Sequence, residues 1–248
     1  MQSAMNDTKA AIVTGASSGI GEAVARAFAS AGIGVALVAR RAGQLDRIAE
    51  DINADGGRAV VVSADLCRER AAAEVVAAAA DLLGSLDILV NAAGVARYAP
   101  VVDGDPAEWQ EMWQVNVLAL ARICREALTR FPACGGHIVH IGSLSGHRVP
   151  PGGGFYAATK FAVRAHAESL RCELRARKNP TRVSCVSPGF VATALAEDYL
   201  RGAGKTLEEL GYEALEPADV ASCVLHAVDS PPGVEINDVL VRPAGQPT

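Results

Sequence analysis

Tyr156 and Lys160 stand four residues apart in the segment Tyr-Ala-Ala-Thr-Lys, and their types and spacing suit acid–base chemistry. On a helix, residues four apart lie side by side on one face. The pKa of a free phenol is about 10, so an unassisted tyrosine exchanges protons poorly at neutral pH. A neighbouring ammonium favours the phenolate and lowers that pKa. The same pair also occurs by chance on helix surfaces, so its meaning depends on the rest of the chain.

Two further polar residues could complete such a site. Ser143 follows an apolar stretch expected to be a strand, and a hydroxyl at the carboxyl end of a parallel strand lies where ligands bind. It could donate a hydrogen bond to a substrate oxygen while Tyr156 exchanges the proton, with Ser145 as the alternative hydroxyl. Asn116 is polar among apolar neighbours on a predicted helix. Its side chain could kink that helix and hold a water leading to Lys160, or serve structure alone.

The elements that must position these residues alternate between short β-branched runs and longer alanine-rich stretches. Strands are expected at 10–14, 34–39, 59–63, 88–91, 137–141, 183–186 and 239–241. Helices are expected near 20–31, 43–54, 68–83, 106–131, 155–177 and 217–228. The strands are apolar on both faces, as buried parallel strands are. The pattern predicts an α/β fold: a single-domain Rossmann-type, doubly wound parallel sheet of about seven strands, with helices on both faces.

A length of 248 residues suits one such domain. Residues 1–8 are expected to be a polar lead-in, of which 1–4 could be foreign to the natural chain because Met5 is an alternative start. Residues 9–248 then form the domain. Its longest irregular stretch, 188–216, is rich in glycine and is a candidate lid over a substrate.

Bulk composition excludes several classes of protein. The net charge of −5 and the lack of basic runs argue against a nucleic-acid partner. The sequence shows neither a signal sequence nor an apolar run of about 18 residues. This argues against a membrane partner and favours a cytoplasmic protein. The six cysteines lack CxxC or Cys/His ligand spacing, so they are expected to be reduced thiols, and no metal site is predicted.

A glycine turn follows the first predicted strand and opens the first helix, with the spacing Gly-x-x-x-Gly-x-Gly. Glycines let the backbone turn tightly and approach a pyrophosphate, which the positive end of the helix attracts. A tight turn without ligand is the alternative. The candidate cofactor-binding residues of this turn are Gly15, Ser17, Ser18, Gly19, Ile20 and Gly21.

Arg40 and Arg41 end the second predicted strand, where a fold that prefers NAD would carry an acid for the ribose 2′-hydroxyl. Two guanidiniums there suit a 2′-phosphate, so NADP(H) is favoured over NAD(H). Arg40 is the stronger candidate because it directly follows the strand, and either arginine could instead be a solvated residue at a helix start.

The ends of the next two predicted strands supply further candidate cofactor contacts. Asp65 and Leu66 could meet the adenine, and Ala92 and Gly94 could let the backbone lie against the cofactor. The amide of Asn91 could contact the cofactor or tie neighbouring strands together, and the sequence does not separate these roles.

Taken together, these motifs resemble the short-chain dehydrogenase/reductase family, in its compact single-domain, NADP-preferring branch. The resemblance runs from about residue 9 to residue 242. It is carried by residues 14–21, the Asn-Ala-Ala-Gly segment 91–94, Asn116, Ser143, Tyr156, Lys160 and the Ser-Pro-Gly segment 187–189.

The resemblance implies roles for particular residues. Asn116, Ser143, Tyr156 and Lys160 would be the catalytic residues, with Lys160 also binding the nicotinamide ribose. The nicotinamide end of the cofactor would lie against Pro188, Gly189, Val191 and Thr193. Ser17, Arg40 and Arg41 would hold the 2′-phosphate, although Ser18 stands where some NADP-dependent relatives carry a basic residue. The resemblance also implies a homotetramer whose largest contacts involve the helices near 106–131 and 155–177.

The sequence therefore predicts an enzyme that transfers hydride between NADP(H) and a carbonyl or secondary alcohol substrate, a small molecule that the sequence does not identify. Tyr98, Arg97, His147 and Arg148 could border its pocket. Two alternatives are a cofactor-binding regulatory protein without turnover and an epimerase or dehydratase built on the same site.

Overall fold

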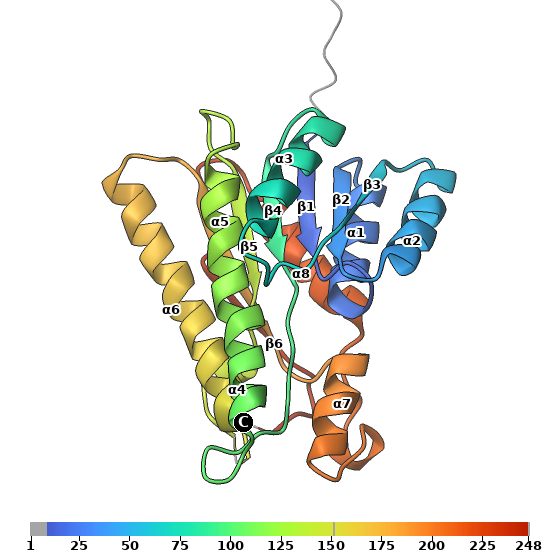
Figure 1. The fold of residues 1–248 in the computed structure, drawn as a ribbon, viewed down its shortest axis with the longest axis vertical. Coiled ribbons are helices and arrows are strands. Elements are labelled where there is room, and N and C mark those ends of the chain that lie inside the picture. Colours follow the sequence, from blue (N-terminus) through green and yellow to red (C-terminus); the bar gives the residue numbers. More distant parts are fainter. Residues whose placement is uncertain (1–8, 151, 248) are drawn as a thin grey trace, which may run out of the picture.

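A computed structural model describes residues 9–150 and 152–247, so the predicted lead-in at 1–8 lies outside the described residues. Seven parallel strands form one sheet in the order β3-β2-β1-β4-β5-β6-β7 (Figure 1). The strands are β1 (Ala10–Thr14), β2 (Gly34–Ala39), β3 (Ala59–Ser63), β4 (Ile88–Asn91), β5 (His137–Ile141), β6 (Arg182–Pro188) and β7 (Asp238–Val241).

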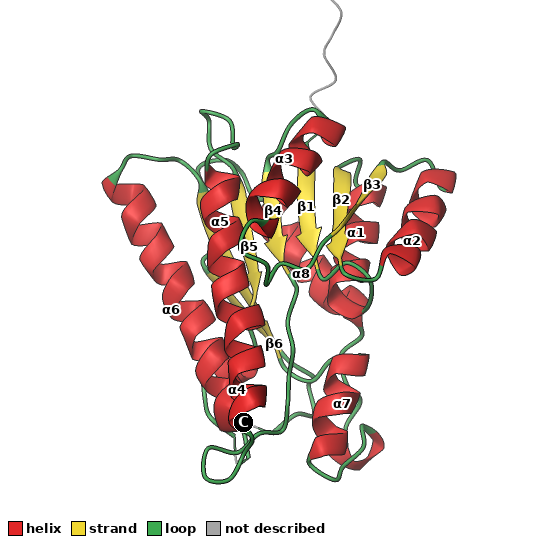
Figure 2. Ribbon diagram, viewed as in Figure 1, coloured by secondary structure: helices red, strands yellow, loops and turns green. Residues whose placement is uncertain are grey.

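Helices cover both faces of this sheet (Figure 2). One face packs against α1 (Gly19–Ser30), α2 (Ala42–Ala54) and α8 (Pro217–Asp229). The other packs against α3 (Ala71–Leu83), α5 (Leu120–Leu128) and α6 (Gly154–Ala176). The short helix α4 (Pro106–Trp113) leads into α5 through a π-helical segment, Gln114–Ala119. The predicted doubly wound α/β fold is confirmed.

Successive side chains of a strand point to opposite faces of the sheet, so the apolar interior consists of two layers. In β1, Ala11 and Val13 pack with Phe28 of α1, whereas Ala10 and Ile12 pack with the helices of the opposite face. All four strand residues are fully buried because each face of the sheet carries helices. Short, wholly apolar runs were therefore sufficient to predict most strand boundaries.

Two differences from the sequence prediction go beyond shifts of a few residues at the ends of elements. The stretch 188–216 is not irregular throughout, because it contains helix α7 (Ala194–Gly202), which stands beyond the carboxyl edge of the sheet (Figure 1). Thr193 begins this helix by accepting a hydrogen bond from the amide of Ala196. The single helix expected at 106–131 is divided by the π-helical segment, which contains Asn116.

The strand order places a crevice where ligands bind in this class of fold. The chain first builds the sheet outward from β1 to β3 and then returns to build it on the other side from β4. The carboxyl ends of β1 and β4 are therefore neighbours from which the connections leave in opposite directions. In the described part of the chain, no helix is long and apolar enough to span a membrane.

Candidate active site

The glycine turn after β1 is packed so closely that side chains are excluded from it. Gly15 has a φ of +68°, and a Cβ there would lie 2.8 Å from Cα of Ala93. A Cβ on Gly21 would lie 2.3 Å from the carbonyl oxygen of Gly15. Gly19, with a φ of +57°, begins α1. The turn therefore needs glycine for conformation and for space, and it leaves the amino end of α1 facing a cavity.

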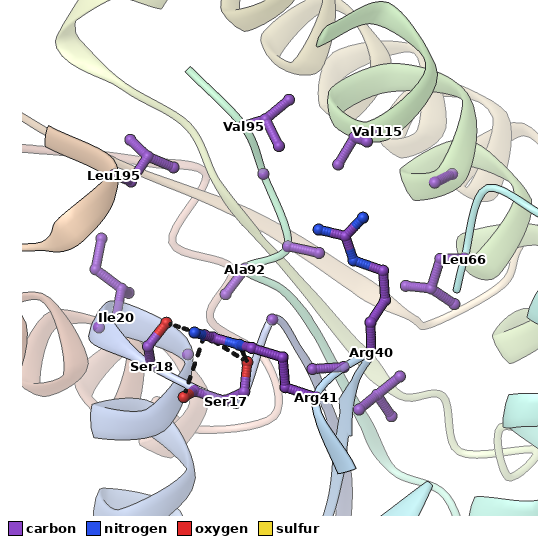
Figure 3. Close-up of a pocket in the computed structure, with 18 of the residues that line it drawn as sticks. Ser17, Ser18, Ile20, Arg40, Arg41, Leu66, Ala92, Val95, Val115 and Leu195 are labelled. Atoms are coloured by element: carbon purple, nitrogen blue, oxygen red, sulfur yellow. Dashed lines mark hydrogen bonds between the residues drawn. The ribbon is translucent and has the colours of Figure 1, made fainter. Parts of the chain in front are cut away.

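That cavity has a volume of about 300 Å³ and runs along the carboxyl ends of β1, β2, β3 and β4 (Figure 3). It collects most of the cofactor-binding candidates from the amino-terminal half of the chain. The predicted residues that line it are Gly15, Ser17, Ser18, Gly19, Ile20, Gly21, Arg40, Arg41, Asp65, Leu66, Ala92 and Gly94.

The two arginines lie differently. The guanidinium of Arg41 reaches back over the glycine turn, where its Nη2 donates to Oγ of Ser17 at 2.9 Å and to Oγ of Ser18 at 2.8 Å. Arg40 extends along the cavity toward Val115 (Figure 3). Both positive charges thus lie at the cavity, but only Arg41 lies over the turn, where the serine contacts hold it. The sequence favoured Arg40, but Arg41 has the better-defined position.

The side chain of Asn91 is outside the lining of this cavity. Its Nδ2 lies 3.2 Å from Sγ of Cys124 and 3.2 Å from Nδ1 of His140, on the face of the sheet covered by α5 and α6. Its side chain therefore has the structural role that the sequence left open. Thr14, which the sequence had included only as the start of the glycine motif, holds the turn instead: its Oγ1 accepts hydrogen bonds from the amides of Ala92 and Ala93, both at 3.1 Å.

A second cavity, of about 560 Å³, continues from the first. Both are lined by Ile20, Ala92, Gly94, Thr193 and Leu195, so the two form one connected space. The second cavity contains the remaining predicted residues of the site, apart from Asn91 and Asn116. They are Ser143, Tyr156, Lys160, Pro188, Gly189, Val191 and Thr193.

Lys160 is buried, and a backbone carbonyl at the end of β5 holds its ammonium. Nζ donates to the carbonyl oxygen of Ile141, the last residue of β5, at 3.0 Å, and lies 5.8 Å from the ring centroid of Tyr156. Ser143 lies just beyond Ile141 and begins a short 3-10 turn, where its Oγ accepts from the amide of Ser145 at 3.1 Å. One strand end therefore positions both the serine hydroxyl and the lysine.

Burial opposes the ionisation of both groups on α6. It raises the pKa of Tyr156 to about 12, although a hydrogen bond with Ser143 acts in the opposite direction. It also lowers the pKa of Lys160 to about 8. The lowering of the tyrosine pKa expected from Lys160 is thus not found in the protein alone. Lys160 still carries its charge at neutral pH, and an additional positive charge in the cavity would favour the phenolate.

Asn116 fixes the backbone around the site. Its Oδ1 accepts from the amide of Val95 and its Nδ2 donates to the carbonyl of Val95, both at 2.9 Å. Nδ2 also donates to Oγ1 of Thr159, which in turn donates to the carbonyl of Tyr156. The π-helical winding around Asn116 agrees with the predicted local distortion of this helix. The amide thereby ties the loop after β4 to the helix that carries Tyr156 and Lys160.

The structure adds the aromatic residues Phe190 and Tyr199 to the lining of the second cavity. Tyr199 of α7 lines the second cavity, with its ring centroid 5.9 Å from that of Tyr156 and 6.0 Å from that of Tyr98. The sequence analysis did not identify Tyr199 because the glycines of 188–216 favour an irregular stretch. The four-residue spacing of Ala196 and Leu200, both buried on α7, was the available signal for a helix.

Of the four pocket residues suggested by the sequence, Tyr98 and Arg148 line the second cavity. Arg97 and His147 do not line it. Arg97 instead forms an ion pair with Glu111, and Nε2 of His147 lies 3.8 Å from Oδ1 of Asp238.

Comparison with known proteins identifies the class to which this fold and site belong. The profile of a family described as short chain dehydrogenase matches residues 9–203. The chain is 39% identical over 249 residues to dehydrogenase/reductase SDR family member 11 of Bos taurus, an alignment covering 96% of this chain and 97% of the relative. The chain therefore belongs to the short-chain dehydrogenase family.

Solved structures agree with this assignment. An alcohol dehydrogenase from the archaeon Thermococcus sibiricus, complexed with 5-hydroxy-NADP, has a TM-score of 0.86 and 28% identity, with 98% of this chain and 99% of that chain covered. The closed form of a serine dehydrogenase complexed with NADP+ has a TM-score of 0.87 and 29% identity, with 96% of both chains covered.

We predict that Gly21→Ala weakens dinucleotide binding by at least about tenfold, because the new Cβ collides with the carbonyl of Gly15 and must displace the turn. The measurement is calorimetric titration with NADPH. Gly43→Ala is the matched control, since a Cβ there has no neighbour within 4 Å. Equal affinities for the two variants would contradict the role of the turn.

Proposed function

We propose that the protein is an NADP(H)-dependent oxidoreductase that interconverts a carbonyl compound and a secondary alcohol. One observation carries this proposal: Ser143, Tyr156 and Lys160 converge in a cavity that opens directly into the cavity beside the glycine turn. A dinucleotide fits the connected space, because Gly15 and Gly21 leave room for a pyrophosphate and Arg41 supplies positive charge beside it. When bound, the nicotinamide would supply or accept the hydride.

The side chains would divide the remaining work. Ser143 would donate a hydrogen bond to the substrate oxygen, and Tyr156 would give that oxygen a proton during reduction or take one during oxidation. Lys160 would hold the nicotinamide ribose and favour the tyrosinate by its charge. The hydrogen bonds of Asn116 support a positioning role, to which we add the proposed proton relay toward Lys160.

Two other activities remain as alternatives to this proposal. A regulatory protein without turnover would have no need of the Ser143, Tyr156 and Lys160 arrangement. An epimerase or dehydratase would use the same groups without net consumption of cofactor. Net oxidation of NADPH in the presence of a carbonyl substrate distinguishes the proposed oxidoreductase from both.

We further propose that the protein is cytoplasmic and forms a homotetramer through the helices near 106–131 and 155–177. Large apolar side chains on these helices, Trp113, Leu118 and Phe161, are each more than one third exposed. Burial of such side chains in contacts between subunits would be favourable.

The first prediction from this proposal concerns Tyr156. Tyr156→Phe keeps the ring but removes the proton donor, so we expect kcat to fall by at least about 100-fold. NADPH affinity should change little, because the loss is chemical. Tyr212→Phe is the control, as Tyr212 does not line either cavity. Turnover of Tyr156→Phe at the rate of the control would refute the assignment.

The second prediction from this proposal concerns the preference for NADPH over NADH. Arg41→Ala should raise KM for NADPH by roughly 10- to 100-fold, the effect of losing a hydrogen bond between charged groups, and should change KM for NADH far less. Arg47→Ala, on the exposed side of α2, is the control. An equal loss with both cofactors would show instead that Arg41 acts by holding Ser17 and Ser18.

The cavity beside Tyr156 favours a substrate that carries an anionic group. Arg148 and Lys205 line it in addition to Lys160, and among the described residues of its lining there is no aspartate or glutamate. The rest of the wall combines aromatic and aliphatic side chains with uncharged polar groups, among them Ser145 and Gln246. The structural likeness to a serine dehydrogenase is consistent with this, since serine carries a carboxylate. We therefore propose a hydroxy acid or oxo acid as the substrate class.

Arg148→Gln should lower kcat/KM for oxo acids by about tenfold or more, the effect of losing one hydrogen bond between charged groups. The reduction of the matching methyl esters should be unaffected. Arg201→Gln is the control, because Arg201 is exposed on α7, pairs with Asp198 and lies outside the cavity. Turnover of neutral ketones with no preference for acids would refute the substrate class and leave the oxidoreductase proposal intact.

A further inference from the structure

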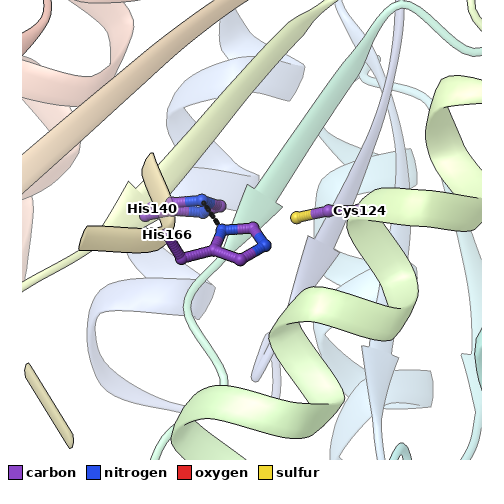
Figure 4. Close-up of side chains that lie close together, drawn as sticks. All are labelled: Cys124, His140 and His166. Carbon is purple, nitrogen blue, oxygen red and sulfur yellow. Dashed lines mark hydrogen bonds between the residues drawn. The ribbon is translucent and has the colours of Figure 1, made fainter. Parts of the chain in front are cut away.

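A second group of reactive side chains lies between the sheet and the helices α5 and α6. Cys124 of α5, His140 of β5 and His166 of α6 each offer one ligand atom, and these atoms all lie within 4.8 Å of one another (Figure 4). Cys124 and His140 are buried, whereas His166 is partly exposed. A thiol and two imidazoles are the donors that zinc prefers in proteins.

The separation of the two imidazoles suits a shared metal ion. Nε2 of His140 and Nδ1 of His166 lie 3.3 Å apart. Two nitrogens bound to tetrahedral zinc at about 2.0–2.1 Å lie about 3.4 Å from each other. A thiolate on the same ion would lie about 3.6 Å from each nitrogen, and Sγ of Cys124 lies within 4.8 Å of the ligand atoms of both histidines.

The protonation states of the imidazoles also suit ligation. Burial lowers the pKa of His140 well below its ordinary value and lowers the pKa of His166 as well, so both rings are neutral at physiological pH. Burial raises the pKa of the Cys124 thiol to about 12, so the thiol is protonated in the metal-free protein. Binding of a divalent ion must release that proton to solvent.

We propose that Cys124, His140 and His166 form a binding site for a zinc-class transition metal ion, separate from the cavity of Ser143 and Tyr156. The fourth position would be taken by water from the side of His166, which is partly exposed. This site is additional to the function proposed above and does not depend on it.

Asn91 lies beside two of the three proposed metal ligands. Its amide lies 3.2 Å from Sγ of Cys124 and 3.2 Å from Nδ1 of His140. When Nε2 of His140 binds the ion, its ring proton moves to Nδ1, while Nδ2 of Asn91 continues to donate a hydrogen bond to Sγ of Cys124. The balance is one metal ion bound, one ring proton shifted within His140 and one thiol proton released.

This site cannot be seen in the sequence, because its members come from three separate elements and lack the short ligand spacings of known zinc motifs. The ion would join β5, which leads to Ser143, to α6, which carries Tyr156 and Lys160. An ion that binds only the folded state stabilises it, so metal should raise the melting temperature.

The test is metal binding by the full-length, untagged protein after treatment with a chelator. Titration with Co²⁺ should give one equivalent of a tetrahedral species with thiolate-to-cobalt charge-transfer absorption, and Zn²⁺ should displace it. Cys124→Ser should abolish the charge-transfer band, and His166→Gln should weaken Zn²⁺ binding by at least about 100-fold, in line with the loss of a metal ligand. Circular dichroism confirms that each variant is folded.

The matched controls are Cys134→Ser and Cys172→Ser, whose thiols are exposed and lie outside the cluster. Both should retain the band and the affinity. Failure of the wild-type protein to bind Co²⁺ or Zn²⁺ at micromolar concentration would overturn the proposal, and so would a charge-transfer band that survives in Cys124→Ser. His166→Gln remains informative if Cys124→Ser does not fold, because His166 is at the partly exposed side.

Discussion

The pairing of β1 with β4 is the constraint on which the rest of the site depends. It brings the ends of two strands distant in sequence so close that Gly15 has no room for a side chain against Ala93. The hydroxyl of Thr14 binds the amides of Ala92 and Ala93 across the same junction. The glycine turn on one side of this contact and the loop after β4 on the other line the cavity beside the turn.

A second contact sets the position of the reactive groups. The carbonyl of Ile141 accepts a hydrogen bond from the buried ammonium of Lys160. This bond satisfies one N–H donor of the ammonium and holds the ammonium beside the end of β5. Ser143 lies two residues beyond Ile141, so the end of one strand leads to the serine hydroxyl and also anchors the ammonium. Helix α6 is held independently by Asn116 through Thr159, so the site has support from both sheet and helix.

The sequence was sufficient where local pattern determines structure. Apolar runs buried on both faces located the strands, and the glycine spacing located the turn after β1. Features set by packing between distant elements were not accessible from sequence. Examples are the side to which Asn91 turns, the anchoring of Arg41 by Ser17 and Ser18, and Tyr199, whose helix is short. Burial also reversed the direction of the tyrosine pKa, because a spacing of four residues does not reveal how much water remains nearby.

The π-helical segment Gln114–Ala119 has a consequence for how this helix tolerates change. A wide turn accommodates one residue more than an α-helical turn, so it shifts the phase between the side chains before and after it. Asn116 can therefore face Val95 while Ile123 and Cys124 still face the sheet. Loss of a single residue from this segment would keep the helix but rotate one half relative to the other by roughly 100°, in keeping with the helical repeat. The segment therefore acts as a spacer whose length matters more than most of its side chains.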